Sequence, residues 1–219
     1  MTTFPGAPRL VRGGLVIIDV DSAAVLRFIA MQYNPDTLTR TLQIQAAGEG
    51  AAHAEVMRLK GPPVETIRLE AELDATDQLE KPSDNPNTVR LGLHPQLAAL
   101  EVLTYPTLQD VQANRSLADQ GMLEILPAAA PLTLFVWSRS RVMPVRITDF
   151  SITEEAFDPA LNPIRAKVSL GLRVLSINDL GFDSKASGIF MVYHQQKERL
   201  AGLNLPGDGL GSLGITEIP

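Results

Sequence analysis

The sequence of 219 residues contains no cysteine, which excludes disulfide bonds, thiolate catalysis and cysteine-ligated zinc. Aromatic residues make up only 5%, so a carbohydrate-binding face built from exposed rings has few residues to draw on. No segment approaches the roughly 20 apolar residues that span a bilayer. The apolar run 15–20 is also too short for a signal peptide. We therefore expect a chain made in the cytoplasm, without membrane insertion.

Positive charge is also in short supply. Nineteen Lys and Arg residues stand against 25 Asp and Glu residues, which gives a net charge of −6 and a pI near 5.1. The basic residues are scattered, whereas a nucleic-acid-binding surface needs them gathered on one face. The hydrophobic content of 45% and the mean hydropathy of +0.06 are typical of a globular domain. We therefore expect no nucleic-acid partner.

The residue types that bind metals do not occur at ligand spacings. The three histidines, His53, His94 and His194, lie far apart in the sequence and are interpreted as surface residues. The acidic segment 74–80 could offer carboxylates to a hard cation, but it lacks the alternating acids and central glycine of an EF-hand loop. A solvated loop is the simpler interpretation, and we expect neither a metal site nor a cofactor.

Catalytic motifs are missing as well. No Gly-x-Ser-x-Gly elbow occurs, and the glycines near 207–211 are not followed by the Lys-Ser/Thr of a phosphate-binding loop. Glu154 and Glu155 are adjacent, so on a strand they would point to opposite faces and could not act as a pair. Trp137 and the phenylalanines are interpreted as core residues. The sequence therefore predicts a protein that is not an enzyme.

Alternation of apolar and polar residues predicts a chain dominated by β-strands with one buried face. The predicted strands are 15–20, 25–33, 37–45, 64–74, 132–137, 142–157 and 164–174. Within 142–157 the apolar positions change phase between Ile147 and Phe150, so we expect a β-bulge there. These strands indicate a mainly β fold, an antiparallel barrel or sandwich.

Helical spacing appears in two places. Leucines recur between 93 and 104 with Pro95 in the first turn, and an amphipathic pattern covers 187–200. The acidic segment 74–86 is predicted as an exposed loop, while 107–121 fits a short helix or a loop equally well. We expect an N-terminal tail (1–12), a β-barrel domain (13–176) and a C-terminal extension (177–219) with a short helix and a Gly/Leu-rich tail.

The strand 164–174 carries the candidate functional residues. Arg165, Lys167 and Arg173 alternate with aliphatic residues, so one face of the strand is apolar and the other is basic. The basic face could line a water-filled lumen in a ring of subunits, or it could be an ordinary exposed sheet face. Composition does not separate these two interpretations.

Four segments, taken in order, resemble the tube-domain proteins of contractile injection systems. They are FIAMQYNPDTLTRTL at 28–42, GPPVETIRLEAELDATDQLEK at 61–81, LHPQLAALEVLTYP at 93–106 and VRITDFSITEEAFDPALNPIRAKVSLGLRVL at 145–175. In that family they would be an Asn-Pro turn between strands, a strand with its acidic loop, the central helix and the closing hairpin. The resemblance implies a phage-tail-tube type of barrel and is strongest to the baseplate-proximal tube initiator, or hub adaptor.

Such a subunit would form a homohexameric ring between the trimeric spike and the inner tube proteins, in contact with other baseplate proteins. The ring would template tube assembly in a particle put together in the cytoplasm. Family members often end in a LysM module that binds peptidoglycan, but no Gly-Asp-Thr-Leu start follows Ser176, so that module is not expected here. Three alternatives remain: a stand-alone glycan- or peptidoglycan-binding β-domain, a hydrolase or metal enzyme on a β scaffold, and the corresponding component of a contractile phage tail. The second would need convergent acids or histidines, for which the spacing gives no support.

Overall fold

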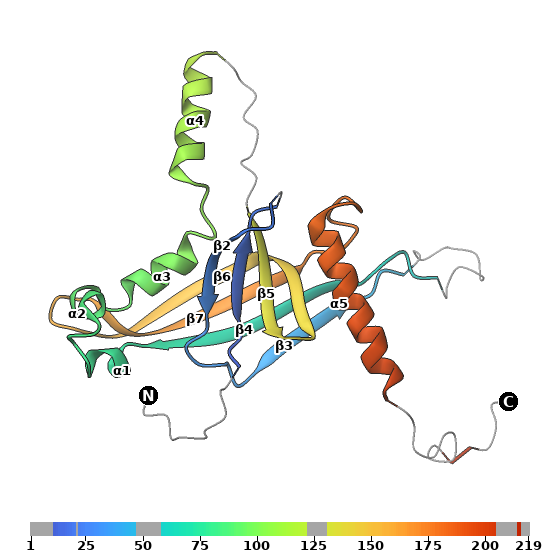
Figure 1. Ribbon diagram of the computed structural model, residues 1–219, viewed down its shortest axis with the longest axis horizontal. Helices are drawn as coiled ribbons and strands as arrows, with labels where there is room; N and C mark the ends of the chain where they lie inside the picture. The colour runs from blue at the N-terminus through green and yellow to red at the C-terminus, as the bar shows by residue number, and fades with distance from the viewer. Residues whose placement is uncertain (1–10, 21, 47–57, 122–130, 205–213, 216–219) are drawn as a thin grey trace.

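A computed structural model describes residues 11–20, 22–46, 58–121, 131–204 and 214–215, and it contains one seven-stranded antiparallel sheet (Figure 1). Its strand order is β2-β1-β5-β6-β7-β4-β3. The strands are β1 (Gly14–Ile18), β2 (Val25–Ala30), β3 (Leu38–Gln43), β4 (Val64–Asp74), β5 (Leu132–Ser138), β6 (Arg141–Phe157) and β7 (Pro163–Val174). All seven predicted strands, and therefore the mainly β fold, are confirmed.

Strand β6 divides the sheet into two layers. It pairs with β5 through Arg141–Val145 and with β7 through Val145–Phe157, and its register shifts between Ile147 and Asp149 as predicted. A bulge lets one strand bend and serve two layers. The short strands β2, β1 and β5 form one layer, and the long part of β6 with β7, β4 and β3 forms the other.

The core lies between these two layers. Leu15 and Phe135 of the short layer belong to the same buried cluster as Leu69, Val168 and Leu170 of the long layer. Phe135 and Val168 are completely buried, with 0% exposure each. Burial of large apolar side chains on both inner faces holds the layers together. The outer face of the long layer is therefore left to polar residues.

Within the described chain, the two ends of the sheet do not pair with each other, and the gap between them is here called the open seam. Strands β2 and β3 are the two ends of the strand order, and no strand pairing joins them within the part of the chain that is described. Instead, the Gln32 side chain accepts a hydrogen bond from the Asp74 backbone N–H (2.9 Å) and donates one to the Asp74 carbonyl (2.7 Å). One amide side chain thus takes the place of a strand partner and connects the segment after β2 to the end of β4.

The described residues also include five helices. They are α1 (Thr76–Leu79), α2 (Pro86–Leu91), α3 (His94–Glu101), α4 (Leu108–Asp119) and α5 (Lys185–Gly202). The predicted helices near 93–104 and 187–200 are confirmed as α3 and α5, and the undecided segment 107–121 contains α4. The prediction that 74–86 is entirely a loop was wrong, because α1 follows directly after β4 and α2 begins at Pro86. Asp74 accepts a hydrogen bond from the Thr76 backbone N–H and so turns the chain just before α1.

Strand β2 also differs from its prediction. It ends at Ala30 rather than at residue 33, and only Ile29 is even half-buried. The expected buried face is missing because β2 is an edge strand at the open seam. The Gly/Leu-rich tail falls almost entirely outside the described residues, and His53 lies outside them too. In the described part of the chain, no helix combines the length and apolarity that crossing a membrane requires.

Candidate assembly surfaces

The outer face of the long layer is a polar surface with balanced charge. Residues 66, 68, 70, 72 and 74 of β4 stand on this face opposite residues 173, 171, 169, 167 and 165 of β7, and the side chains at these positions are exposed or half-buried. The face continues onto β6 through the residues opposite the same positions of β7. Basic and acidic residues occur on it in equal number: Arg68, Arg146, Arg165, Lys167 and Arg173 against Glu70, Glu72, Asp74, Asp149 and Glu155. The three predicted residues, Arg165, Lys167 and Arg173, all lie there.

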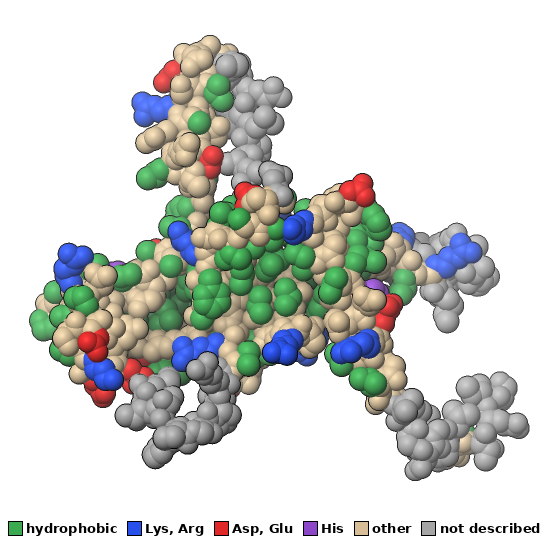
Figure 2. Space-filling model, in the orientation of Figure 1, with side chains coloured by type: hydrophobic (Ala, Val, Ile, Leu, Met, Phe, Trp, Pro, Cys, Tyr) green, Lys and Arg blue, Asp and Glu red, His purple; other side chains and the backbone are tan. Residues whose placement is uncertain are grey.

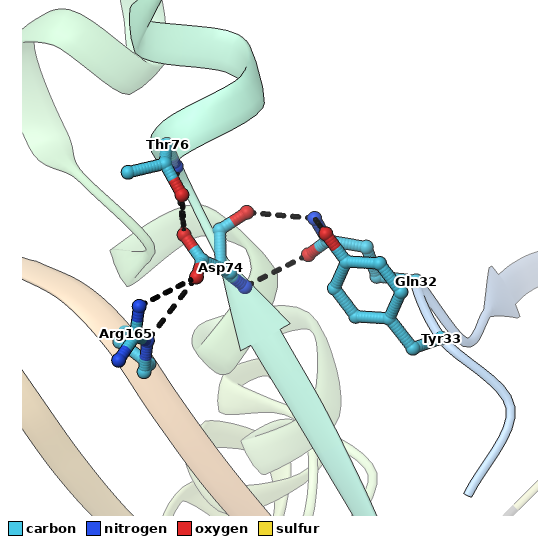
Figure 3. Close-up of polar contacts among 5 residues, drawn as sticks. All are labelled: Gln32, Tyr33, Asp74, Thr76 and Arg165. Atoms are coloured by element: carbon cyan, nitrogen blue, oxygen red, sulfur yellow. Dashed lines mark hydrogen bonds and ion pairs between the residues drawn. The ribbon is translucent and has the colours of Figure 1, made fainter. Parts of the chain in front are cut away.

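Arg165 is held at one end of this face (Figure 3). Its guanidinium lies 3.1 Å from the Asp74 carboxylate, which also accepts hydrogen bonds from the backbone and the hydroxyl of Thr76. Burial would raise the pKa of Asp74, but the hydrogen bonds from Thr76 and the charge of Arg165 outweigh it and lower that pKa. Asp74 therefore joins β4, β7 and α1 at the point where Gln32 crosses the seam.

The other two predicted residues are paired as well. Lys167 lies 3.3 Å from Glu155 on β6, and Arg173 forms an ion pair with Asp179, in the turn that precedes α5. Each pair is partly exposed, so its contribution to stability is small, roughly 0–1 kcal/mol. The ion pairs do, however, neutralise the basic side chains of β7. The face therefore carries balanced charges of both signs and not a row of unpaired basic side chains.

Gly171 keeps the middle of this face flat. A Cβ atom at this position would lie 2.6 Å from Oδ2 of Asp149, which is closer than real side chains approach. Asp149 follows the β6 bulge and stands opposite Gly171 in the register. The missing side chain thus gives the Asp149 carboxylate its place on the sheet surface.

A second polar cluster lies on the inner face, where α5 covers the end of β4. The Glu65 side chain is only 3% exposed, yet its carboxylate accepts hydrogen bonds from Arg40 (2.7 Å), Tyr193 (2.9 Å) and Lys197 (2.7 Å). Burial opposes ionisation of Glu65, but the two cations outweigh it and its pKa is lowered. Burial and the Glu65 charge raise the pKa of Tyr193, so its hydroxyl stays a donor.

The Glu65 cluster is not among the predicted sites, although the sequence contains a signal for it. In the alternation of β4, residue 65 has the same phase as the buried residues Ile67, Leu69, Ala71 and Leu73. A glutamate in an apolar phase needs buried partners. Two of those partners, Tyr193 and Lys197, lie 128 and 132 residues away, and no local pattern connects them.

Two strand edges of the long layer have no partner in the described chain. Strand β3 pairs only with β4, and the second half of β6 (146–157) pairs only with β7. Both edges expose backbone N–H and C=O groups that could continue a sheet. They are the third feature of this layer that bears on assembly, besides its flat polar face and its paired charges.

The remaining candidate residues lie in different parts of the fold. Among the described residues, no three His, Asp or Glu side chains gather in a metal-binding group. Glu154 and Glu155 stand opposite Ala166 and Arg165, which confirms that they point to different faces. Trp137 packs against the core as predicted. The same prediction was wrong for three phenylalanines with exposures of 49–70%, because they lie on an edge strand, a strand end and a turn: Phe28, Phe157 and Phe182.

Comparisons with known proteins give weak likenesses. No family model and no curated protein matches this sequence. Among solved structures, the chain is similar to one in the tail of an empty gene transfer agent particle with C6 symmetry, at 10% identity and a TM-score of 0.28. A chain from the virion of the native gene transfer agent gives 10% identity and a TM-score of 0.26. Each likeness covers 74% of this chain and 90% of the other.

Both TM-scores lie below 0.5, so neither likeness by itself assigns a function to this chain. Any function must therefore be inferred from the surfaces of the chain itself. Those surfaces are a flat polar sheet face, two strand edges that have no partner among the described residues and, on the opposite layer, exposed apolar residues of β2.

Proposed function

We propose that this chain is a non-enzymatic structural subunit of a phage-tail-like contractile particle. Six copies would form a ring that joins the central spike to the inner tube and templates the first tube layer. The observation that carries the proposal is the long layer β6-β7-β4-β3, with its uncovered polar face and free edges on both sides. The copy number and the place beside the spike come from the resemblance of 28–175 to tube-domain proteins.

The two free edges support a ring in which every contact is the same. Neighbouring strands alternate in direction across β6, β7, β4 and β3. The free half of β6 in one copy would therefore run antiparallel to β3 of the next and extend the same sheet. Such a head-to-tail contact closes into a ring when the rotation between copies fits. Pairing would also remove the exposed edges, which otherwise invite aggregation.

The polar face supports a position at the lumen of that ring. Its ion pairs, Arg165–Asp74 and Lys167–Glu155, keep the charges of both signs close together. A wall of this kind is wettable and has little net field, so it would neither hold nor repel cargo of one sign. The core faces the other way, so the polar face is free to meet water.

Electron microscopy of particles that contain the chain tests the proposal directly. We expect a layer with sixfold symmetry next to the spike, with the long layer facing the lumen. Proline substitutions at the neighbouring positions Thr153 and Glu154 test the edge, because adjacent residues direct their N–H groups to opposite sides of a strand. One substitution should keep the monomer folded and prevent ring formation, and the other should break the β6–β7 ladder.

The outcomes separate clearly. A folded β6 proline variant that still enters six-membered rings would contradict edge pairing. A stable twofold dimer by light scattering, with these edges buried against each other, would contradict the ring itself.

A further inference from the structure

Strand β3 offers one of the two edges that the proposed ring needs, yet few of its side chains anchor it. Only Leu38 and Arg40 are half-buried, and the other four residues of the strand are exposed. Among the described strands, β3 pairs with β4 alone. Beyond β3 the chain continues in an arm where Lys60 donates a backbone hydrogen bond to Gln45, and two paired strands by themselves are marginally stable. An edge strand with so little buried surface opens locally unless a further contact holds it.

Arg40 provides such a contact through the buried Glu65. It stands opposite the fully buried Ile67 in the β3–β4 register, so its side chain lies on the inner face of the strand. Its guanidinium lies 2.6 Å from the Glu65 carboxylate and donates a hydrogen bond to the Tyr193 hydroxyl at 3.1 Å. Water replaces a contact to a buried charge only in part, so the loss of this pair is more costly than the loss of an exposed one. Arg40 therefore joins the edge strand to the body of the fold.

Helix α5 fixes the other side of this contact. Phe190 and Tyr193 belong to the main core cluster, so the middle of the helix is anchored without any help from β3. One turn after Tyr193, Nζ of Lys197 lies 2.7 Å from the Glu65 carboxylate and 4.1 Å from the centre of the Tyr193 ring. Figure 1 shows α5 running past the end of the sheet where β3 finishes and β4 begins, and Figure 2 shows Lys and Arg side chains over β3 and the lower half of α5. The Glu65 carboxylate is thus held by a helix that is itself fixed.

We propose that the Arg40–Glu65 pair, fixed by α5, is a clamp that keeps β3 in the sheet and so prepares its edge for pairing with a second copy. The proposal rests on the proposed function, because it names the residues that position one of the two ring edges. They are positioning residues, since their side chains lie on the inner face of the sheet and not along the edge that a neighbour would meet. A strand that is already ordered loses less conformational freedom when it pairs, which favours association.

Native-state hydrogen exchange on the full chain in its monomeric form tests the clamp, because it measures local opening of β3 apart from global unfolding. Arg40→Met removes the guanidinium, while the two α5 side chains still bind Glu65, so we expect the variant to fold. The β3 amides that bond to β4 should then exchange about tenfold faster without denaturant, because the clamp contact opposes their opening. Arg40→Lys should recover part of this protection, since it keeps a positive charge beside Glu65.

A double variant tests whether Arg40 and Glu65 act through each other. Glu65→Gln removes the charge that Arg40 binds and should also speed exchange of the β3 amides. Combined with Arg40→Met, it should accelerate exchange by clearly less than the product of the two separate effects, because both changes remove the same contact. Two independent contributions would multiply, and that result contradicts the clamp.

Two controls separate the clamp from a general loss of stability or charge. Ile18→Val trims a core side chain of the short layer that is 5% exposed, so it should speed exchange through global unfolding and leave the local opening of β3 unchanged. Arg199→Met removes a positive charge from α5 at an exposed position that forms no ion pair among the described residues. It should change neither kind of exchange.

Assembly experiments link the clamp to the ring. Each variant is mixed with an equal amount of tagged parent chain while particles assemble, and its share in the sixfold rings is measured. The share of Arg40→Met should fall below that of the parent, with Arg40→Lys between the two, because a chain whose β3 is open cannot offer this edge. Ile18→Val and Arg199→Met should enter the rings as the parent does.

The outcomes decide both parts of the proposal. Unchanged exchange of the β3 amides in Arg40→Met overturns the clamp, and so does an equal increase in Ile18→Val, because the cluster would then act only on global stability. Faster β3 exchange with an undiminished share in the rings overturns the role in assembly, since pairing itself would order the strand. If the parent chain forms no sixfold rings, the proposed function fails, whereas selective β3 exchange in Arg40→Met still supports the clamp.

Discussion

Helices α4 and α5 differ in how they contact the rest of the fold. Helix α5 buries Ala186, Ser187, Phe190 and Tyr193, and a serine at its N-cap, Ser184, accepts a hydrogen bond from the Ser187 backbone. Helix α4 has a comparable cap at Thr107 but buries nothing. Local signals therefore start both helices, while only tertiary contacts decide which one belongs to the stable body.

The largest effect should come from the apolar anchor of α5. Replacing Phe190 by Ala removes a side chain that is 7% exposed and belongs to the main core cluster. We expect a loss of about 3–5 kcal/mol in the free energy of unfolding. Urea unfolding followed by circular dichroism measures it, and a loss below about 1 kcal/mol would mean that α5 is not part of the cooperative unit.

Next should come Glu65→Gln in the buried cluster. The substitution removes the charge that Arg40 and Lys197 share, and both cations are only partly exposed. Breaking a buried ion pair typically costs about 3–5 kcal/mol, and we expect about 3 kcal/mol here because the cations can reach water. The same unfolding experiment applies, with Glu70→Gln on the exposed polar face as a matched control that should change little.

The Glu65 cluster also predicts a pH dependence. The pKa of Glu65 is lowered from its ordinary value of 4.5, so its contribution to stability is complete above that pH and is lost as the pH falls through the folded-state pKa. Acid titration of stability should therefore show a component below pH 4.5 that Glu65→Gln removes. Identical acid profiles for the two proteins would contradict the lowered pKa.

A smaller effect is expected for Tyr193→Phe. It deletes only the hydroxyl that donates to Glu65 and leaves the ring in the core. A hydrogen bond to a charged group contributes about 1.5–3 kcal/mol, and the lower end applies because Arg40 and Lys197 still bind the carboxylate. A thermal shift of the variant against the parent protein, at pH 7 and constant salt, gives the difference.

The smallest effect should come from α4. Val111→Ala and Leu117→Ala are expected to change the free energy of unfolding of the monomer by less than about 0.5 kcal/mol, because neither side chain is buried. Losses as large as those in α5 would show that α4 packs on its own body, and the contrast between the two helices would disappear.

The long strands could be predicted because their two faces meet different surroundings. In 64–74 and 164–174, one face meets the core and the other meets water, so alternation is strict and the predicted bounds match to within one residue. The bulge in β6 could be predicted for the same reason, because the apolar positions of the sequence change phase there. Sequence alone could therefore place the polar face and its residues Arg165, Lys167 and Arg173.

Burial by distant segments could not be predicted in the same way. Strand β2 is apolar apart from Arg27, but no layer covers this edge strand, so the face that was expected to be buried is exposed. The partners of Arg165 and Arg173 come from β4 and from the turn before α5. For α4, the Thr107-x-x-Asp110 pattern was a local signal that favoured a helix over a loop.

The bulge at Thr148 has a consequence for how this chain can vary. Side chains of a strand switch faces with every residue, so the extra residue sets which side Asp149–Phe157 present. Loss of a single codon there would turn Phe150 and Ile152 outward and draw Asp149 and Glu155 toward the core. A substitution in β6 therefore alters one side chain, whereas a change in length at the bulge would exchange the two faces of Asp149–Phe157.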